Sequence, residues 1–234
     1  MLFAEDEYVE REVELEAPEL PGGKLVLRLF GWPMGCSGDI VWRGAWGALQ
    51  ALLAEAPRLR NRRALELGAG CGVLAFAAAT LGAHSVATDG NEEELPLLEK
   101  NAANFRDSNG LGGSLSARQL EWGRAAAERS GLGPRSFDWI LGSEIVYIPD
   151  CIPELAETLA FFLADTGEAL IANTAVATRT DQEEARELLC KLQLVDTVRP
   201  LLRAPHASPR GAAHGLRLGT LARCWRDSGP KALL

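Results

Sequence analysis

The chain has 234 residues, of which 47% are hydrophobic and 24% are charged, and its formal net charge is −8. These are ordinary values for a globular protein, and the length suits one α/β domain with its own core. The acidic balance, without any cluster of lysine and arginine, argues against general nucleic-acid binding and favours basic partners, such as a protein surface that presents a basic side chain.

The sequence shows no membrane-spanning segment, no targeting peptide and no metal-binding motif. No apolar stretch approaches membrane-spanning length, and residues 1–11 are acidic, unlike a signal or transit peptide. The five cysteines are scattered without a C-x-x-C pair, and the chain has three histidines. This pattern matches no metal-binding motif. We therefore expect a cytoplasmic or nuclear protein that has no membrane contact and no bound metal.

The first part of the chain predicts a hairpin and a helix. Apolar residues alternate over Val9–Glu16 and Lys24–Phe30, on either side of a turn rich in glycine and proline, which indicates two antiparallel strands. Helical spacing of apolar residues begins at Ala45, and Pro57 is expected to end that helix, which we expect to lie across the edge of the sheet.

The next stretch reads as a strand, a glycine turn, a helix and a second strand. The buried strand is 64–67, the helix is the alanine-rich segment 73–81, and the second strand, 85–88, ends in Asp89. The remaining expected elements, in chain order, are a helix from near Leu95 to Phe105, strands 116–120 and 137–141, helix 153–163, strand 168–172, helix 181–192, strand 194–198 and a last strand 216–224. Strands that alternate with helices in this way predict a doubly wound, mostly parallel seven-stranded sheet with an antiparallel last strand.

The glycine turn indicates a pocket for a nucleoside-containing cofactor. Glycines let the backbone approach a ligand closely, and a carboxylate on the next strand, here Asp89, can accept the hydroxyls of a ribose. A dinucleotide fingerprint would require a third glycine where this chain has Val73, whereas the spacing of Gly68, Gly70 and Gly72 is that of methyltransferases dependent on S-adenosylmethionine. Glu66, just before the turn, would repel a pyrophosphate but suit the ammonium or sulfonium of that cofactor. Val73 thus disfavours the rival interpretation as a nicotinamide-dependent oxidoreductase.

Ligands of open parallel sheets bind at the carboxyl ends of the strands. On the predicted map these ends carry the glycine turn with Ala69, Asp89 with Gly90, Trp122, and the segment Ser143–Tyr147. An indole such as that of Trp122 can cover an adenine by stacking. The clustering of these residue types at four consecutive strand ends indicates the active site.

These motifs together resemble methyltransferase family 16, a group of seven-β-strand protein methyltransferases that are mostly lysine-directed. The resemblance runs from about residue 38 to about residue 170 and rests on Trp42, residues 65–72, Thr88-Asp89, Asn101 with Asn104, residues 120–123 and residues 137–147. It implies a Rossmann-like methyltransferase domain over 1–234, with 1–38 as a hairpin extension of the core 39–234. It also implies S-adenosylmethionine contacts at positions matching Trp42, Gly68, Asp89, Trp122 and Ser143. The family's D-x-x-[YF] motif is present with Glu144 in place of Asp and with Tyr147 retained.

The expected reaction is methylation of a side-chain nitrogen on a protein substrate, lysine first, with S-adenosylhomocysteine as the product. Glu144 would bind the incoming ammonium, and Tyr147 would supply an aromatic wall and a hydroxyl. We expect a monomer. Methylation of arginine, histidine or a small-molecule amine on the same fold stays open, as does a non-catalytic interaction module.

Overall fold

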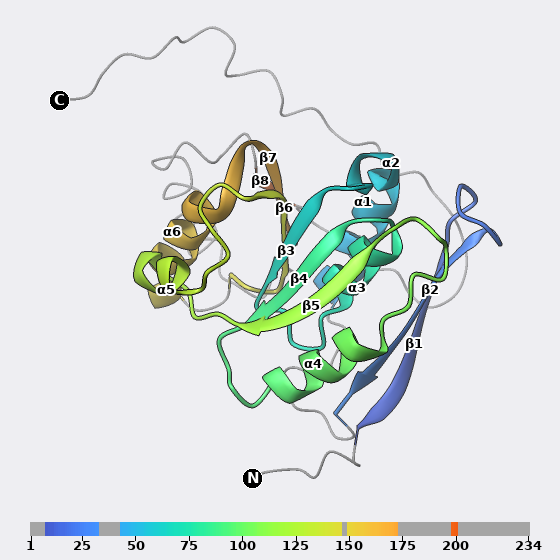
Figure 1. The fold of residues 1–234 in the computed structure, drawn as a ribbon, viewed down its shortest axis with the longest axis horizontal. Coiled ribbons are helices and arrows are strands. Elements are labelled where there is room, and N and C mark those ends of the chain that lie inside the picture. Colours follow the sequence, from blue (N-terminus) through green and yellow to red (C-terminus); the bar gives the residue numbers. More distant parts are fainter. Residues whose placement is uncertain (1–7, 33–42, 147–148, 173–197, 201–234) are drawn as a thin grey trace, which may run out of the picture. The chain divides into compact units, whose positions relative to one another are not determined.

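The computed structural model describes residues 8–32, 43–146, 149–172 and 198–200 (Figure 1). Contacts divide the chain into a unit of residues 1–204 and a second unit of residues 205–234, so every described residue belongs to the first unit. The predicted helix 181–192, the predicted last strand 216–224 and most of the predicted strand 194–198 lie outside the described residues. The expectation of a single domain stays a prediction.

The N-terminal hairpin is confirmed. Strands β1 (Val9–Glu16) and β2 (Lys24–Gly31) pair antiparallel over their whole length. Alternate residues are buried along β2 and in the second half of β1, as the alternation in the sequence predicts, whereas the first four residues of β1 are exposed. The apolar face of the hairpin belongs to the same core cluster as helices α3 (Val73–Thr80) and α4 (Leu95–Asn104), and β2 packs on both of them.

The main sheet contains six parallel strands among the described residues, in the order β5-β4-β3-β6-β7-β8 (Figure 1). This order is that of the doubly wound Rossmann-like fold, in which the chain starts in the middle of the sheet and winds outwards in both directions. The strands are β3 (Arg63–Leu67), β4 (His84–Asp89), β5 (Ser114–Gln119), β6 (Phe137–Ser143), β7 (Leu163–Ala172) and β8 (Val198–Pro200). The predicted fold class is therefore confirmed.

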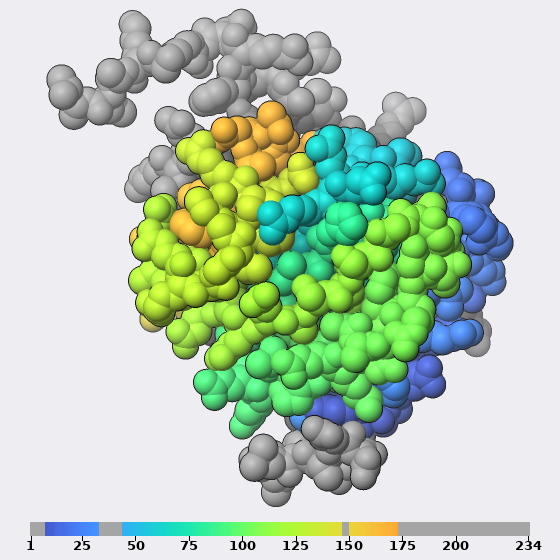
Figure 2. Space-filling view, viewed as in Figure 1, coloured from blue at the N-terminus to red at the C-terminus, as the bar shows by residue number. Residues whose placement is uncertain are grey.

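Helices cover both faces of the sheet because successive residues of each buried strand point to opposite sides. On one face Ala64, Trp139 and Leu170 pack with α1 (Arg43–Ala54), α3 (Val73–Thr80), α4 (Leu95–Asn104) and the hairpin. On the other face Leu65 and Ile140 pack with α5 (Arg124–Arg129) and α6 (Ile152–Phe162). In Figure 2 the green atoms of the β5 and α4 region lie between the blue hairpin and the yellow-green region of α5.

Three details differ from the sequence prediction. Helix α1 packs on α3, β6 and β7, so it covers a face of the sheet rather than its edge. Pro57 does follow the end of α1, but it lies in the first turn of a second short helix, α2 (Ala56–Leu59). Helix α5 falls in a segment that the sequence did not predict to be helical. No helix within the described ranges has the length and apolarity needed to cross a membrane.

Candidate active site

The predicted site residues that the structure describes lie at one end of the sheet. Strands β5, β4, β3 and β6 are neighbours and parallel, so their carboxyl ends meet along a single edge. At these ends or just beyond them lie Trp122, Asp89, the turn 68–72 and Ser143 with Glu144. The sheet thus places side by side four segments that are far apart in sequence.

The glycine turn takes a backbone shape that suits glycine at three positions. Gly68, Gly70 and Gly72 have φ values of 58°, 52° and 81°, in the left-handed region that side chains with a Cβ disfavour. A Cβ on Gly68 would lie 2.8 Å from Cγ2 of Ile145 and 3.4 Å from Cζ2 of Trp122. The indole of Trp122 therefore lies against the turn, as a residue that covers a ligand held there must.

The Asp89 carboxylate is fixed beside the same turn. Its Oδ2 accepts the Gly70 N–H at 2.9 Å, and its Oδ1 accepts the Asn91 N–H at 2.9 Å. The main chain is fixed as well, since the Leu120 N–H donates to the Asp89 carbonyl at 2.8 Å and the Ala69 N–H donates to the Thr88 carbonyl at 2.9 Å. Gly90 continues the segment beside Leu120, so that the ends of β4 and β5 lie in contact.

Glu66 is fully buried beneath the first turn of α3. Its Oε2 accepts the Ala75 N–H at 2.7 Å, and its Oε1 accepts the Leu74 N–H at 3.3 Å. Burial raises the pKa of this carboxyl to about 8, against the lowering effect of the two backbone hydrogen bonds. The carboxyl group therefore anchors the start of α3, and at neutral pH much of it is uncharged. Its predicted contact with a cofactor cation stays a prediction.

Ser143 ends β6 and is half-buried, and Glu144 follows it in an unusual conformation. Glu144 has a φ of 57°, one of only a few such non-glycine residues among those described. Its N–H donates to the Ala172 carbonyl at 2.7 Å, and its Oε1 accepts the Gly44 N–H at 2.9 Å. Backbone strain of this kind concentrates at functional sites.

Two predicted site residues, Trp42 and Tyr147, lie outside the described residues. Gly44, which binds Glu144, is a residue near the site that the sequence did not single out, and Ile145, which lies in the predicted segment 143–147, packs against Gly68. Gly44 lies close to Trp42 in the sequence, but its contact with Glu144 joins segments that are far apart, and only the fold reveals it.

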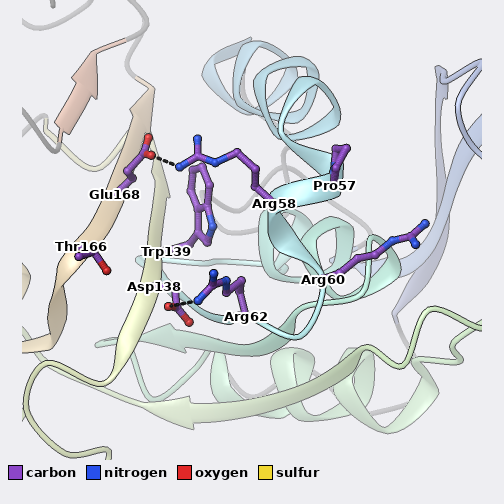
Figure 3. Close-up of a pocket in the computed structure, with 8 residues that line it drawn as sticks. All are labelled: Pro57, Arg58, Arg60, Arg62, Asp138, Trp139, Thr166 and Glu168. Atoms are coloured by element: carbon purple, nitrogen blue, oxygen red, sulfur yellow. Dashed lines mark hydrogen bonds and ion pairs between the residues drawn. The ribbon is translucent and has the colours of Figure 1, made fainter.

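A cavity of about 230 Å³ lies near the opposite, amino end of the sheet (Figure 3). Its lining includes Arg58, which forms an ion pair with Glu168, and Arg62, whose Nη1 lies 3.2 Å from Oδ1 of Asp138. The Arg58 guanidinium also stacks over Trp139, with its Cζ 5.1 Å from the ring centroid. These charges neutralise one another, and the predicted site residues are absent from the lining.

Comparison with known proteins gives relatives that are named as methyltransferases. The chain is 30% identical to protein N-lysine methyltransferase METTL21A of Xenopus tropicalis over 134 residues, which are 57% of this chain and 59% of that protein. It is 36% identical to protein-lysine N-methyltransferase EFM3 of Chaetomium thermophilum, over 53% of this chain and 38% of that protein. The matches thus span between about two fifths and three fifths of the length of these curated relatives.

A solved structure shows a similar fold at low identity. The S-adenosylmethionine-dependent methyltransferase of Agrobacterium tumefaciens superposes with a TM-score of 0.50 and 13% identity, over 77% of this chain and 58% of that one. The family model described as lysine methyltransferase matches residues 31–191, which is more than half of the chain and includes the glycine turn, Asp89, Trp122 and Glu144. The chain therefore belongs to the lysine methyltransferase family.

Proposed function

We propose that this protein transfers a methyl group from S-adenosylmethionine to the side-chain amine of a lysine in a protein substrate. The observation that carries the proposal is the meeting of the glycine turn, Asp89, Trp122 and Glu144 at adjacent strand ends, in a chain of the lysine methyltransferase family. Relatives named as protein-lysine methyltransferases support the choice of lysine.

The residues at the turn fit the nucleoside part of the cofactor. Asp89 is held beside Gly70, and a carboxylate can accept several hydrogen bonds, as binding of both ribose hydroxyls requires. The absence of a Cβ at Gly68 lets Trp122 and Ile145 close on the turn, which provides apolar surface for an adenine. Bound there, the cofactor would supply an activated methyl group on a sulfonium.

The chain's own residues would then prepare the amine. Lysine has an unperturbed pKa of about 10.4, so it arrives as an ammonium and must lose a proton before its lone pair can attack the methyl carbon. Glu144, at the end of β6, is the carboxylate that we assign to binding this ammonium and aligning it. The ammonium would release its proton to water, and the amine lone pair would then form the N–C bond while the electron pair of the broken C–S bond stays on the sulfur that the bound cofactor would supply. Positioning supplies most of the rate in such a displacement.

Other methyl acceptors would react by the same chemistry, and the experiment below distinguishes them from lysine. An arginine, a histidine or a small-molecule amine would also present a nitrogen to the methyl group, and a non-catalytic module would bind a partner without transfer. Family membership and the names of the relatives favour lysine over these alternatives.

Calorimetry with S-adenosylmethionine, followed by transfer of a radiolabelled methyl group to proteins of a cell lysate, tests the proposal. We expect one cofactor site in the wild type, and Asp89→Ala should weaken binding by about 1.5–3 kcal/mol, the range for hydrogen bonds to charged groups. Glu144→Gln should bind the cofactor as the wild type does but lose transfer, because its neutral amide cannot pair with an ammonium.

Acid hydrolysis of the labelled product and identification of the methylated amino acid then assign the acceptor. Label on N-methyl-lysines agrees with the proposal, and label on arginine or histidine moves the assignment to that side chain. A folded wild type that neither binds the cofactor nor transfers a methyl group would overturn the proposal.

A further inference from the structure

We infer that Gly44 is a positioning residue for Glu144, and that glycine at this position is what allows the site to use glutamate. This inference rests on the proposed role of Glu144 in methyl transfer. It concerns how helix α1, which precedes the cofactor turn in the chain, sets the reach of a carboxylate on β6.

The contact between the two residues is close and direct. The Gly44 N–H, in the first turn of α1, donates to Oε1 of Glu144 at 2.9 Å. This N–H is among those at a helix N-terminus that have no partner within the helix, so the carboxylate supplies one. A carboxylate at this end of a helix is also favoured by the helix dipole.

The missing side chain of Gly44 makes this contact possible. A Cβ built on Gly44 would lie 2.6 Å from Oε1 and 3.1 Å from Cδ of Glu144, the first of which is shorter than any ordinary contact. It would also lie 3.0 Å from the carbonyl oxygen of Ala172, at the end of β7. Any larger residue would therefore push the Glu144 carboxylate away from its observed place.

The backbone of Glu144 has little freedom to shift and so relieve a clash with a side chain at position 44. Its N–H is bonded to the Ala172 carbonyl at 2.7 Å, and its φ of 57° is held by the surrounding structure. With the main chain fixed, the position of the carboxylate depends on the length of the side chain and on the space in front of it. Gly44 provides that space.

The pairing accounts for the departure from the D-x-x-[YF] motif. An aspartate at position 144 would hold its carboxylate one methylene nearer to β6, farther from a Cβ at position 44 than Oε1 of Glu144 is. The longer glutamate reaches α1 and requires glycine there. The two positions should therefore behave as one unit when they are changed.

A double-mutant cycle tests this coupling. The four proteins are the wild type, Gly44→Ala, Glu144→Asp and the double variant G44A/E144D, and Gln50→Ala, exposed on the same helix, controls for changes to α1. For each protein we would measure kcat and KM with the unmethylated substrate protein that the lysate experiment identifies. We would also measure the affinity for S-adenosylmethionine by calorimetry and the thermal midpoint of unfolding.

We expect G44A alone to lower kcat by about 10- to 100-fold, the range for misplacing a reacting group by about 1 Å, with cofactor affinity within about twofold of wild type. In the E144D background the same change should lower kcat by less than about threefold, because the shorter side chain avoids the new Cβ. The G44A/E144D protein should thus be more active than G44A.

The thermal midpoints test the pairing without relying on activity. Alanine is the better helix former, so G44A would raise the midpoint if nothing opposed its Cβ. We expect it instead to lower the midpoint, by at least about 3 °C more in the wild-type background than in E144D.

Equal effects of G44A in both backgrounds, on kcat and on the midpoint, would overturn the inference and assign the glycine to the Ala172 carbonyl alone. A wild type without transfer activity would defeat the proposed function instead. The midpoints of the four proteins would still decide whether Gly44 and Glu144 are coupled.

Discussion

At the scale of single residues, Glu66 shows how burial changes the chemistry of a side chain. The sequence predicts a charge next to the cofactor, because an acid just before a glycine turn is read as facing a ligand. In the structure the carboxyl accepts hydrogen bonds from the backbone N–H groups of Leu74 and Ala75, and its contact with a cofactor cation stays a prediction. The sequence does not reveal the hydrogen bonds to α3, because they depend on how α3 packs on β3.

The raised pKa of Glu66 predicts how stability depends on pH. The group's ordinary pKa is 4.5 and its folded pKa is about 8, so between these values the folded state binds the proton more tightly than the unfolded state does. The contribution of this residue to the free energy of unfolding should be largest below about pH 4.5 and should fall as the pH rises towards about 8.

Urea denaturation of wild type and Glu66→Gln at several pH values checks this expectation. Glutamine keeps the shape and cannot ionise, so the difference in unfolding free energy between variant and wild type should shift in favour of the variant as the pH rises through this window. A difference that stays constant from pH 5 to about pH 8 would show that Glu66 has an ordinary pKa in the folded protein.

At the scale of elements, Asn101 joins the hairpin to the sheet domain. This buried residue of α4 accepts the Phe30 N–H at 2.6 Å and donates from Nδ2 to the carbonyls of Phe30 at 3.0 Å and Cys71 at 2.8 Å. A second link is the hydrogen bond from Nε1 of Trp32 to Oε2 of Glu94, at 2.9 Å. One side chain thus connects β2, α4 and the end of the glycine turn.

Removing this link should destabilise the protein. Asn101→Ala leaves backbone groups of Phe30 and Cys71 without their partner, and we expect a loss of roughly 2–4 kcal/mol in the free energy of unfolding. Asn104→Ala is the matched control, because Asn104 is exposed on the same helix and donates only within it, to the Lys100 carbonyl. Equal denaturation midpoints for the two variants would contradict the role assigned to Asn101.

The sequence predicts the strongly patterned elements well and the short ones poorly. The hairpin, the cofactor turn and α4 follow from alternation, glycine spacing and the helical spacing of apolar residues. Helix α5 is too short to show a period, and Ala127 is its one fully buried residue. The contact between Gly44 and Glu144 depends on how α1 packs against β6 and β7, which no local pattern encodes.

At the scale of the whole molecule, the formal net charge of −8 should matter to a basic substrate. Opposite charges raise the rate of encounter, and salt screens this attraction. We expect KM for the protein substrate to rise severalfold as ionic strength goes from about 0.05 to about 0.3 M, with kcat little changed. Steady-state kinetics over this range are the measurement, and the KM of S-adenosylmethionine is the internal reference. If KM for the protein substrate does not change with ionic strength, the surface charge plays no part in recognition.

The strand order also sets when the site can form during synthesis. The central strand β3 carries the glycine turn and pairs with β4 on one side and with β6 on the other. Because β6 ends at Ser143, a nascent chain that stops short of this residue has β3 as an open edge and has no Glu144. Pairings between segments so distant in sequence are slow to form. A growing chain should therefore acquire cofactor binding only after Ser143 has left the ribosome, and nascent chains shorter than this should depend on chaperones that shield β3.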